Sequence, residues 1–332
     1  MEHCAIDLGG RKSQLCVRSQ QGQILSEFVV ATSALPETLR EMPRCRVVME
    51  TAAETFRVAD AALACGHEVK VVPSTLVRAL GVGARRTKTD QRDARALSEA
   101  SCRMELPSVH IPSWRSREWK AICGVHDVLI SSRTKMINNV RGWLRGQAKR
   151  PRDGAAATFA ERVRKLKLAT PAHIETELRL IEILSEQIRA SEARLEEMAG
   201  TDPVCARLMT VPGVGASTAV RFLAALDEVT RFPNAHRVEA YLGLAPGENS
   251  SSERQQRLSI TKAGPSTVRW CLVQAAWVLR TCCRNAGARP LQEWALEVEK
   301  RRGSRIATVA LARKLAGILY ALWRDGTTYS AH

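Results

Sequence analysis

The first hundred residues alternate between short apolar runs and turn residues, a pattern typical of a mixed α/β domain. Alternating or continuous apolar runs predict strands at residues 4–8, 13–18, 24–30, 46–50 and 68–72. Glycine turns separate the first three, at Gly9-Gly10 and around Gly22. Helical spacing predicts helices at 36–42 and 53–65 between the later strands. The predicted order is therefore β-β-β-α-β-α-β.

This order matches the ribonuclease-H-like (RuvC-like) arrangement, in which an antiparallel meander continues into parallel strands connected by helices. Other α/β folds fit the same order. The pattern becomes helical after Pro73, with a helix predicted at 90–102 and a break at Pro107 and Pro112. We expect a first domain over residues 1–108.

The middle of the chain, residues 109–200, reads as a basic helical and coiled-coil linker. Residues 114–149 form an amphipathic pattern with a basic side. Further on, apolar residues recur every seven positions, at Ile174, Ile181, Ile188 and Leu195. This heptad pattern predicts either self-association or an intramolecular antiparallel hairpin with the 114–149 helix, and three to four heptads do not decide between them.

The last third, residues 201–332, is predicted to be mainly α-helical. Residues 208–226 resemble a helix-hairpin-helix motif whose turn contains Gly213 and Gly215, glycines that permit backbone N–H groups to approach a phosphate. An ordinary turn between two helices is the alternative. The stretch 243–264 is less regular, and we expect it to carry residues that act in chemistry.

Composition favours a polyanionic partner. Fifty Lys and Arg against 34 Asp and Glu give a formal net charge of +16, and the basic residues cluster. One cluster contains Arg85, Arg86, Lys88 and Arg92, which we expect to contact nucleic acid. A merely solvated basic surface is the alternative.

Neither export nor a membrane is indicated. The ten cysteines include no C-x-x-C pair and are expected to be reduced core thiols. The chain start lacks the basic and apolar regions of a leader, and no apolar run reaches about 18 residues. We expect a cytoplasmic protein without a membrane partner.

Four acidic residues are predicted to meet at one end of the predicted sheet. Asp7 and Glu50 end two strands that lie side by side in this topology, and Asp90 and Asp93 share a face of a helix that can pack over those ends. Such a cluster repels itself unless a cation neutralises it, and carboxylates without His or Cys suit Mg²⁺ or Mn²⁺. Individually, each acid has an ordinary alternative as a cap or an ion-pair partner.

The irregular stretch places hydroxyl groups next to basic groups. Ser250, Ser251 and Ser252 precede a set of cations, namely Arg254, Arg257 and Lys262. A serine that attacks phosphorus must lose its proton while the phosphate is neutralised, and nearby cations assist this. A triple serine by itself is more often a polar loop.

Together these motifs resemble the DEDD transposases of bacterial insertion sequences, which pair a RuvC-like domain with a serine-bearing carboxy-terminal transposase domain. The resemblance spans nearly the whole chain and is carried by A-I-D at 5–7, V-M-E at 48–50, K-T-D-x-x-D-A at 88–94, V-P-G-V-G at 211–215, Y-L-G-L-A-P at 241–246 and I-T-K-A-G at 260–264. It implies that Asp7, Glu50, Asp90 and Asp93 bind the metal, and that Ser251 is the nucleophile and forms a covalent phosphoserine.

The resemblance also implies partners and a location. These are the DNA of element ends and target, a structured noncoding bridge RNA as guide, and further copies of the chain in a dimer or tetramer, acting at the nucleoid of a bacterial cell. Glycine usually follows the nucleophilic serine in this family, whereas Ser252 and Glu253 follow Ser251 here. An inactive nucleic-acid-binding relic therefore stays open, as does a junction-resolvase-like nuclease that uses the same acids with water. Asp7-Leu8-Gly9-Gly10 also fits a sugar-kinase phosphate loop, but no second strand meander follows.

Overall fold

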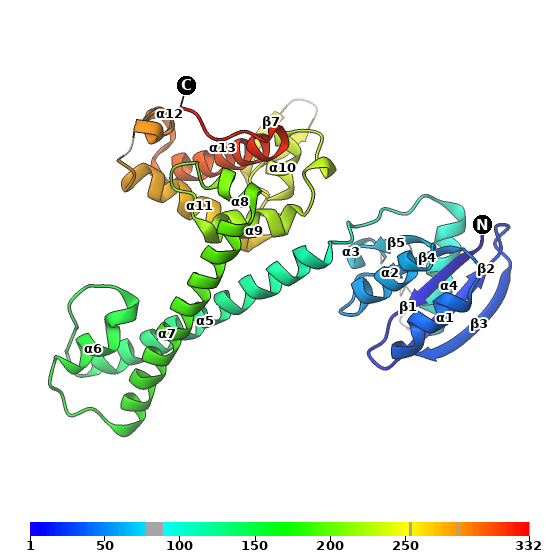
Figure 1. Ribbon diagram of the computed structural model, residues 1–332, viewed down its shortest axis with the longest axis horizontal. Coiled ribbons are helices and arrows are strands. Elements are labelled where there is room, and N and C mark those ends of the chain that lie inside the picture. Colours follow the sequence, from blue (N-terminus) through cyan, green and yellow to red (C-terminus); the bar gives the residue numbers. More distant parts are fainter. Residues whose placement is uncertain (78–88, 252–253, 285, 332) are drawn as a thin grey trace. The chain divides into compact units, whose positions relative to one another are not determined.

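The computed structural model describes residues 1–77, 89–251, 254–284 and 286–331, and the chain divides into two units, Met1–Pro112 and Ser113–His332. The first unit is a mixed sheet with helices on both faces (Figure 1). Its elements are β1 (His3–Asp7), β2 (Lys12–Arg18), β3 (Ile24–Ala31), α1 (Leu35–Glu41), β4 (Arg46–Glu50), α2 (Thr55–Ala64), β5 (Glu68–Val72), α3 (Ser74–Val77) and α4 (Asp90–Arg103). The predicted strands and helices up to residue 102 are confirmed to within two residues at each end.

The sheet combines two kinds of pairing. Its strand order is β3-β2-β1-β4-β5, in which β3, β2 and β1 are antiparallel and β1, β4 and β5 are parallel. Alternate residues of β1 and β4 face opposite sides. Ile6 and Met49 pack with residues of α1 and α2, whereas Ala5 and Val48 pack with Leu97 of α4. The α4 face is the one that matters for the acidic residues.

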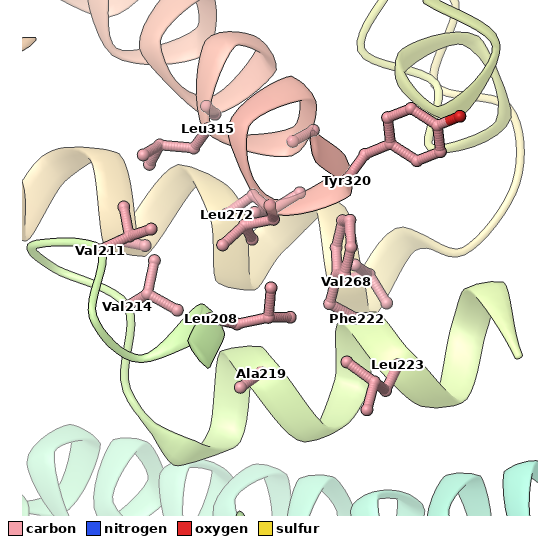
Figure 2. Close-up of a cluster of buried hydrophobic side chains, with 14 of the residues drawn as sticks. Leu208, Val211, Val214, Ala219, Phe222, Leu223, Val268, Leu272, Leu315 and Tyr320 are labelled. Carbon is pink, nitrogen blue, oxygen red and sulfur yellow. The ribbon is translucent and has the colours of Figure 1, made fainter. Parts of the chain in front are cut away.

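The second unit is mostly helical, as predicted. Its helices are α5 (Trp114–Gly146), α6 (Phe159–Arg164), α7 (Ala172–Thr201), α8 (Pro203–Leu208), α9 (Ala216–Leu226), α10 (Ala235–Tyr241), α11 (Ser266–Thr281), α12 (Arg289–Arg302) and α13 (Ser304–Asp325), with short 3-10 turns at Ala156–Thr158, Val229–Arg231 and Ala286–Ala288. A buried core joins side chains of α8, α9, α11 and α13, and Figure 2 shows Leu208, Phe222, Leu272 and Leu315 among them.

The heptad helix packs inside the chain. α5 and α7 run antiparallel along one another, since His126 contacts Ser191 at 3.1 Å and Asn139 donates to Glu177 at 2.6 Å. Ile174, Ile181, Ile188 and Leu195 are all buried there. Of the two arrangements left open by the heptads, the intramolecular hairpin is therefore the one that this fold has.

Helix α13 is long and apolar enough to cross a membrane, and among the described residues it is the one helix that meets this test. Half of its apolar window is buried within the chain, with Leu311, Leu315 and Leu319 fully covered by neighbouring helices. Packing in the core thus accounts for its composition.

The stretch after α10 differs from its prediction. Instead of an irregular segment it forms an antiparallel hairpin of β6 (Pro246–Ser251) and β7 (Arg254–Ile260). The sequence between Glu248 and Gln256 lacks apolar alternation, so the hydrophobic pattern carries no strand signal there.

Candidate functional site

Asp7 and Glu50 stand at neighbouring strand ends. β1 and β4 pair in parallel with Ala5 opposite Val48 and Ile6 opposite Met49, so the next step of the register brings Asp7 level with Glu50. By alternation both acids lie on the same face as Ala5 and Val48, which is the face covered by α4. The two carboxylates are thus placed by the same pairing that forms the sheet.

Helix α4 brings a third acid to this edge. It runs antiparallel to β1, because the His3 ring contacts the Ser101 hydroxyl at 2.8 Å near the other end of both elements. The four residue steps from His3 to Asp7 in a strand cover about 13 Å, and the eight steps from Ser101 back to Asp93 in a helix cover about 12 Å. Asp93 therefore lies level with Asp7, and it is 8% exposed.

Asp90 and Arg92 are placed differently from Asp93. Asp90 is the first residue of α4 and is exposed, as is Arg92. The hydroxyl of Thr89 caps the helix by accepting from the Arg92 N–H at 3.4 Å. The helix dipole favours carboxylates in the first turn of a helix. Asp90 and Asp93 can therefore stabilise α4 whether or not they also act in catalysis. Arg85, Arg86 and Lys88 lie outside the described residues.

An ion pair fixes α4 over the sheet. Arg95 donates to both carboxylate oxygens of Glu27 on β3, each at 2.5 Å. These hydrogen bonds lower the pKa of Glu27 from its ordinary value of 4.5. Arg18 of β2 adds a 2.9 Å bond to the Ser98 hydroxyl. Arg95 thus serves to orient the helix that carries Asp93.

A divalent cation suits these acids in chemistry. Carboxylate oxygens are hard ligands, and Asp7, Glu50 and Asp93 lie at one edge and on one face. Burial raises the pKa of the Cys205 thiol to about 12 and of Cys271 to about 11, which disfavours thiolate ligands at those positions. Within residues 1–77, 89–251, 254–284 and 286–331, however, no three His, Cys, Asp or Glu side chains converge closely enough to hold an ion as they stand. The four-acid metal site therefore stays a prediction.

The predicted nucleophile lies at the end of a strand. Ser251 is the last residue of β6 and pairs in register with Arg254, the first residue of β7, while Ser250 pairs with Gln255. Arg257 pairs with Glu248 further down the hairpin. Ser252 and Glu253 lie outside the described residues. The hairpin thus carries the serine and two of the predicted cations on adjoining strands.

Two glycine-containing segments, 241–246 and 260–264, contact each other at the base of this hairpin. The Lys262 N–H donates to the Gly243 carbonyl at 3.1 Å, and the Thr261 N–H to that of Ala245 at 3.0 Å. Gly243 and Gly264 have φ of +68° and +66°, and a β-carbon on Gly243 would lie 2.2 Å from the Ala263 carbonyl oxygen. The motifs at 241–246 and 260–264 therefore form one backbone joint.

Sequence reasoning missed Arg269, which secures this joint. Its guanidinium donates to the carbonyls of Leu242 at 2.9 Å and Ala263 at 2.8 Å, one from each motif. An isolated arginine in a helix carries no sequence signal of such a role. Lys262 itself is exposed and has a φ of +56°.

The predicted helix-hairpin-helix turn has a clear packing role. Gly213 lies against α11, where a β-carbon would be 2.6 Å from the Ala275 carbonyl oxygen. Val211 and Val214 beside it point into the core (Figure 2). Gly215 is exposed and caps α9. Close packing explains Gly213, and phosphate binding by the two glycines remains a prediction.

Comparison with known proteins gives consistent matches along the chain. A DEDD transposase model of the IS110 type matches residues 4–147, and the transposase IS116/IS110/IS902 family matches residues 205–290. A protein from Pseudomonas aeruginosa described as a probable family 20 transposase is 30% identical, covering 99% of this chain and 98% of its own. The transposase for insertion sequence element IS1328 from Yersinia enterocolitica is 28% identical over 98% of this chain and 97% of its own. That for IS1111A from Coxiella burnetii is 26% identical over 98% and 90%.

Proposed function

Since the chain belongs to the IS110/IS116 family of insertion-sequence transposases, we propose that it cuts and rejoins DNA with a divalent-metal site at Asp7, Glu50, Asp90 and Asp93 and a nucleophile at Ser251. The observation that carries the proposal is the shared edge and face of Asp7, Glu50 and Asp93. The strand order, with an antiparallel meander leading into parallel strands, supports a ribonuclease-H-like assignment for residues 1–108. We assign 109–200 to the linker and 201–332 to the transposase domain.

The acids are proposed to hold Mg²⁺ or Mn²⁺. Bound divalent ions supply the charge that activates an attacking oxygen and stabilises a leaving oxygen in phosphodiester chemistry. The protein contributes two carboxylates fixed by strand pairing and a third fixed by α4. Asp90, at the start of α4, is the most exposed of the four acids.

Ser251 is proposed to attack DNA directly. Its hydroxyl oxygen forms a bond to a backbone phosphorus, the bond from that phosphorus to a deoxyribose oxygen breaks, and the serine proton passes to a base while the freed sugar oxygen takes a proton. A sugar hydroxyl from a second DNA end then attacks the phosphoserine and restores the serine, so strands are exchanged without net hydrolysis. Arg254, which pairs with Ser251 in the hairpin register, is proposed to neutralise phosphate charge.

Nucleic acid is proposed to bind the basic residues near the acids and near the serine hairpin. These are Arg85, Arg86, Lys88 and Arg92, which lie close to Asp90 and Asp93 in the sequence, Arg257 and Lys262 on and beside the hairpin, and the Gly213 and Gly215 turn. We further propose a structured noncoding guide RNA, a dimer or tetramer, and action at the nucleoid in the cytoplasm. The charge of +16 supports polyanion binding but does not separate RNA from DNA.

The test is strand exchange between an element-end plasmid and a target plasmid, with the RNA encoded beside the gene supplied. Asp7→Ala, Asp93→Ala and Ser251→Ala are each expected to abolish the recombinant product, and omission of the RNA to reduce it to background. Full activity of any one variant removes that residue from the mechanism. A Ser251→Ala protein that still cuts with Mg²⁺ indicates a resolvase-like nuclease with water as nucleophile. Binding without any cutting by the unaltered protein indicates a relic.

A further inference from the structure

A basic pocket lies at the α6 end of the α5–α7 hairpin. The last turns of α5, the segment 147–155 and the start of α6 enclose about 580 Å³. Six cationic side chains line it, from Arg141, Arg145, Lys149, Arg150, Arg152 and Arg162. We call this site the tip pocket. Figure 1 shows α6 at the end of the α5–α7 pair remote from the remaining helices of this unit.

The charge of the tip pocket is not balanced by its own lining. Asp153 is the one carboxylate lining it among the described residues, and it pairs with Arg150 at 3.3 Å. Six cations and one anion leave five net positive charges. Arg164, also on α6 but outside the pocket, instead pairs with both Glu175 and Glu182. These two carboxylates therefore pair with an arginine outside the pocket and are not part of its lining.

The protein holds part of this charge in place. Arg162 donates to the backbone carbonyls of Arg152 and Ala155, the latter at 2.7 Å. These bonds hold the 152–155 segment against α6 at one side of the pocket. The Arg141 guanidinium lies 5.6 Å from the centre of the buried Phe159 ring. Arginines oriented in this way lose less side-chain freedom on binding, which favours affinity.

The lining selects phosphate rather than a small organic ligand. Pockets for small molecules are mostly apolar and aromatic. Here Leu144 and Phe159, the largest apolar side chains in the lining, are themselves 1% exposed, so neither offers a face to a base. Arg145, Lys149 and Arg152 are exposed around them. Such a site attracts negative charge.

We propose that the tip pocket binds backbone phosphates of a nucleic-acid strand, as an anchoring site that shares no residue with the acids or the serine hairpin. The inference rests on the proposed function only in that the chain acts on nucleic acid. A strand is favoured over a free phosphate compound because five uncompensated charges match several neighbouring phosphates, and because a further exposed cation, Lys135, lies on α5 outside the pocket lining.

The test compares two double variants of equal charge. Arg145→Ala with Arg152→Ala removes two exposed cations of the tip pocket, whereas Arg179→Ala with Arg189→Ala removes two exposed cations of α7 outside it. Binding of the full chain to a labelled RNA hairpin, duplex DNA and single-stranded DNA is measured by fluorescence anisotropy in EDTA at several salt concentrations. No cutting is needed, so an inactive metal or serine site leaves the measurement intact.

The pocket variant is expected to bind at least one probe more weakly than the control variant, with a salt slope lower by about 2, since each lost phosphate contact lowers it by about 1. The probe affected identifies RNA or DNA as the strand held there. Equal affinities and slopes for both variants on all three probes overturn the proposal. So does saturable binding of inorganic triphosphate that the pocket variant loses while its nucleic-acid binding matches the control.

Discussion

Gly264 and Tyr241 touch through their backbones, since a β-carbon on residue 264 would lie 2.0 Å from the Tyr241 carbonyl oxygen. The contact joins the segment before the serine hairpin to the segment after it. Neither partner belongs to a proposed catalytic group. The position of the hairpin base therefore depends on a residue with no side chain.

Replacing this glycine is expected to disturb the hairpin. Gly264→Ala adds a clash with a backbone oxygen to a φ of +66°, and the left-handed conformation alone costs about 1–2 kcal/mol. We expect a lower unfolding temperature and loss of strand exchange. Gly326→Ala is the matched control, because φ there is +69° in the left-handed region and the added carbon would meet only Arg207 Nη1, at an ordinary contact distance of 3.5 Å. Equal stability and activity of the two variants would contradict the role given to the joint.

Arg269 is expected to matter for activity more than its place on α11 implies. Arg269→Ala leaves the carbonyls of Leu242 and Ala263 without their shared donor, at a cost of about 1–3 kcal/mol if both stay away from water. Strand exchange should fall sharply while circular dichroism stays near that of the parent protein. Arg305→Ala, an exposed arginine on α13, serves as control. Unchanged exchange by the Arg269 variant would show that the joint holds without it.

The acid site has a readout that does not require DNA. Mg²⁺ held by Asp7, Glu50 and Asp93 would stabilise the folded chain by about 2.7 kcal/mol at 100 times its dissociation constant. We expect Mg²⁺ or Mn²⁺ to raise the unfolding temperature of the parent protein, and Asp93→Asn to remove most of that rise. Asp325→Asn alters an exposed acid paired with Arg324 and should keep it. An equal metal response of the two variants would exclude Asp93 as a ligand.

The Glu27–Arg95 pair gives a pH dependence of known sign. Arg95 lowers the pKa of Glu27 in the folded chain, so the pair's stabilisation is present above pH 4.5 and is lost as pH falls through the lowered value. Glu27→Gln should therefore be less stable than the parent near neutral pH, with the difference shrinking below pH 4.5 and vanishing once the pH is below the lowered pKa of Glu27. Unfolding by urea across this range measures it. A difference that persists at low pH would mean that the carboxylate charge is not the cause.

The first unit was predictable because its signals are local. Apolar alternation and the turns at Gly22 and Gly66 set its strands and helices, and the topology then brings Asp7 beside Glu50. The β6–β7 hairpin had no such signal, because its sequence lacks apolar alternation. The heptad pattern predicted which side of α7 is buried. It did not predict whether the helix that covers this side belongs to the same chain. The spacing of the acids along the sequence likewise does not determine whether their side chains come close enough to share an ion.

Three neighbouring serines make the identity of the nucleophile a separate prediction. Ser251 ends β6 opposite Arg254 in the hairpin register, whereas Ser250 pairs with Gln255. We expect a denaturing gel to show a covalent protein–DNA product with the parent protein, with Ser250→Ala and with Ser252→Ala, and none with Ser251→Ala. Ser266→Ala, at the exposed start of α11, controls for loss of a hydroxyl elsewhere. Because glycine is usual after this serine, Ser252→Gly is expected to increase the yield of the product. A product that disappears with Ser250→Ala or Ser252→Ala and survives Ser251→Ala would move the nucleophile to that neighbour.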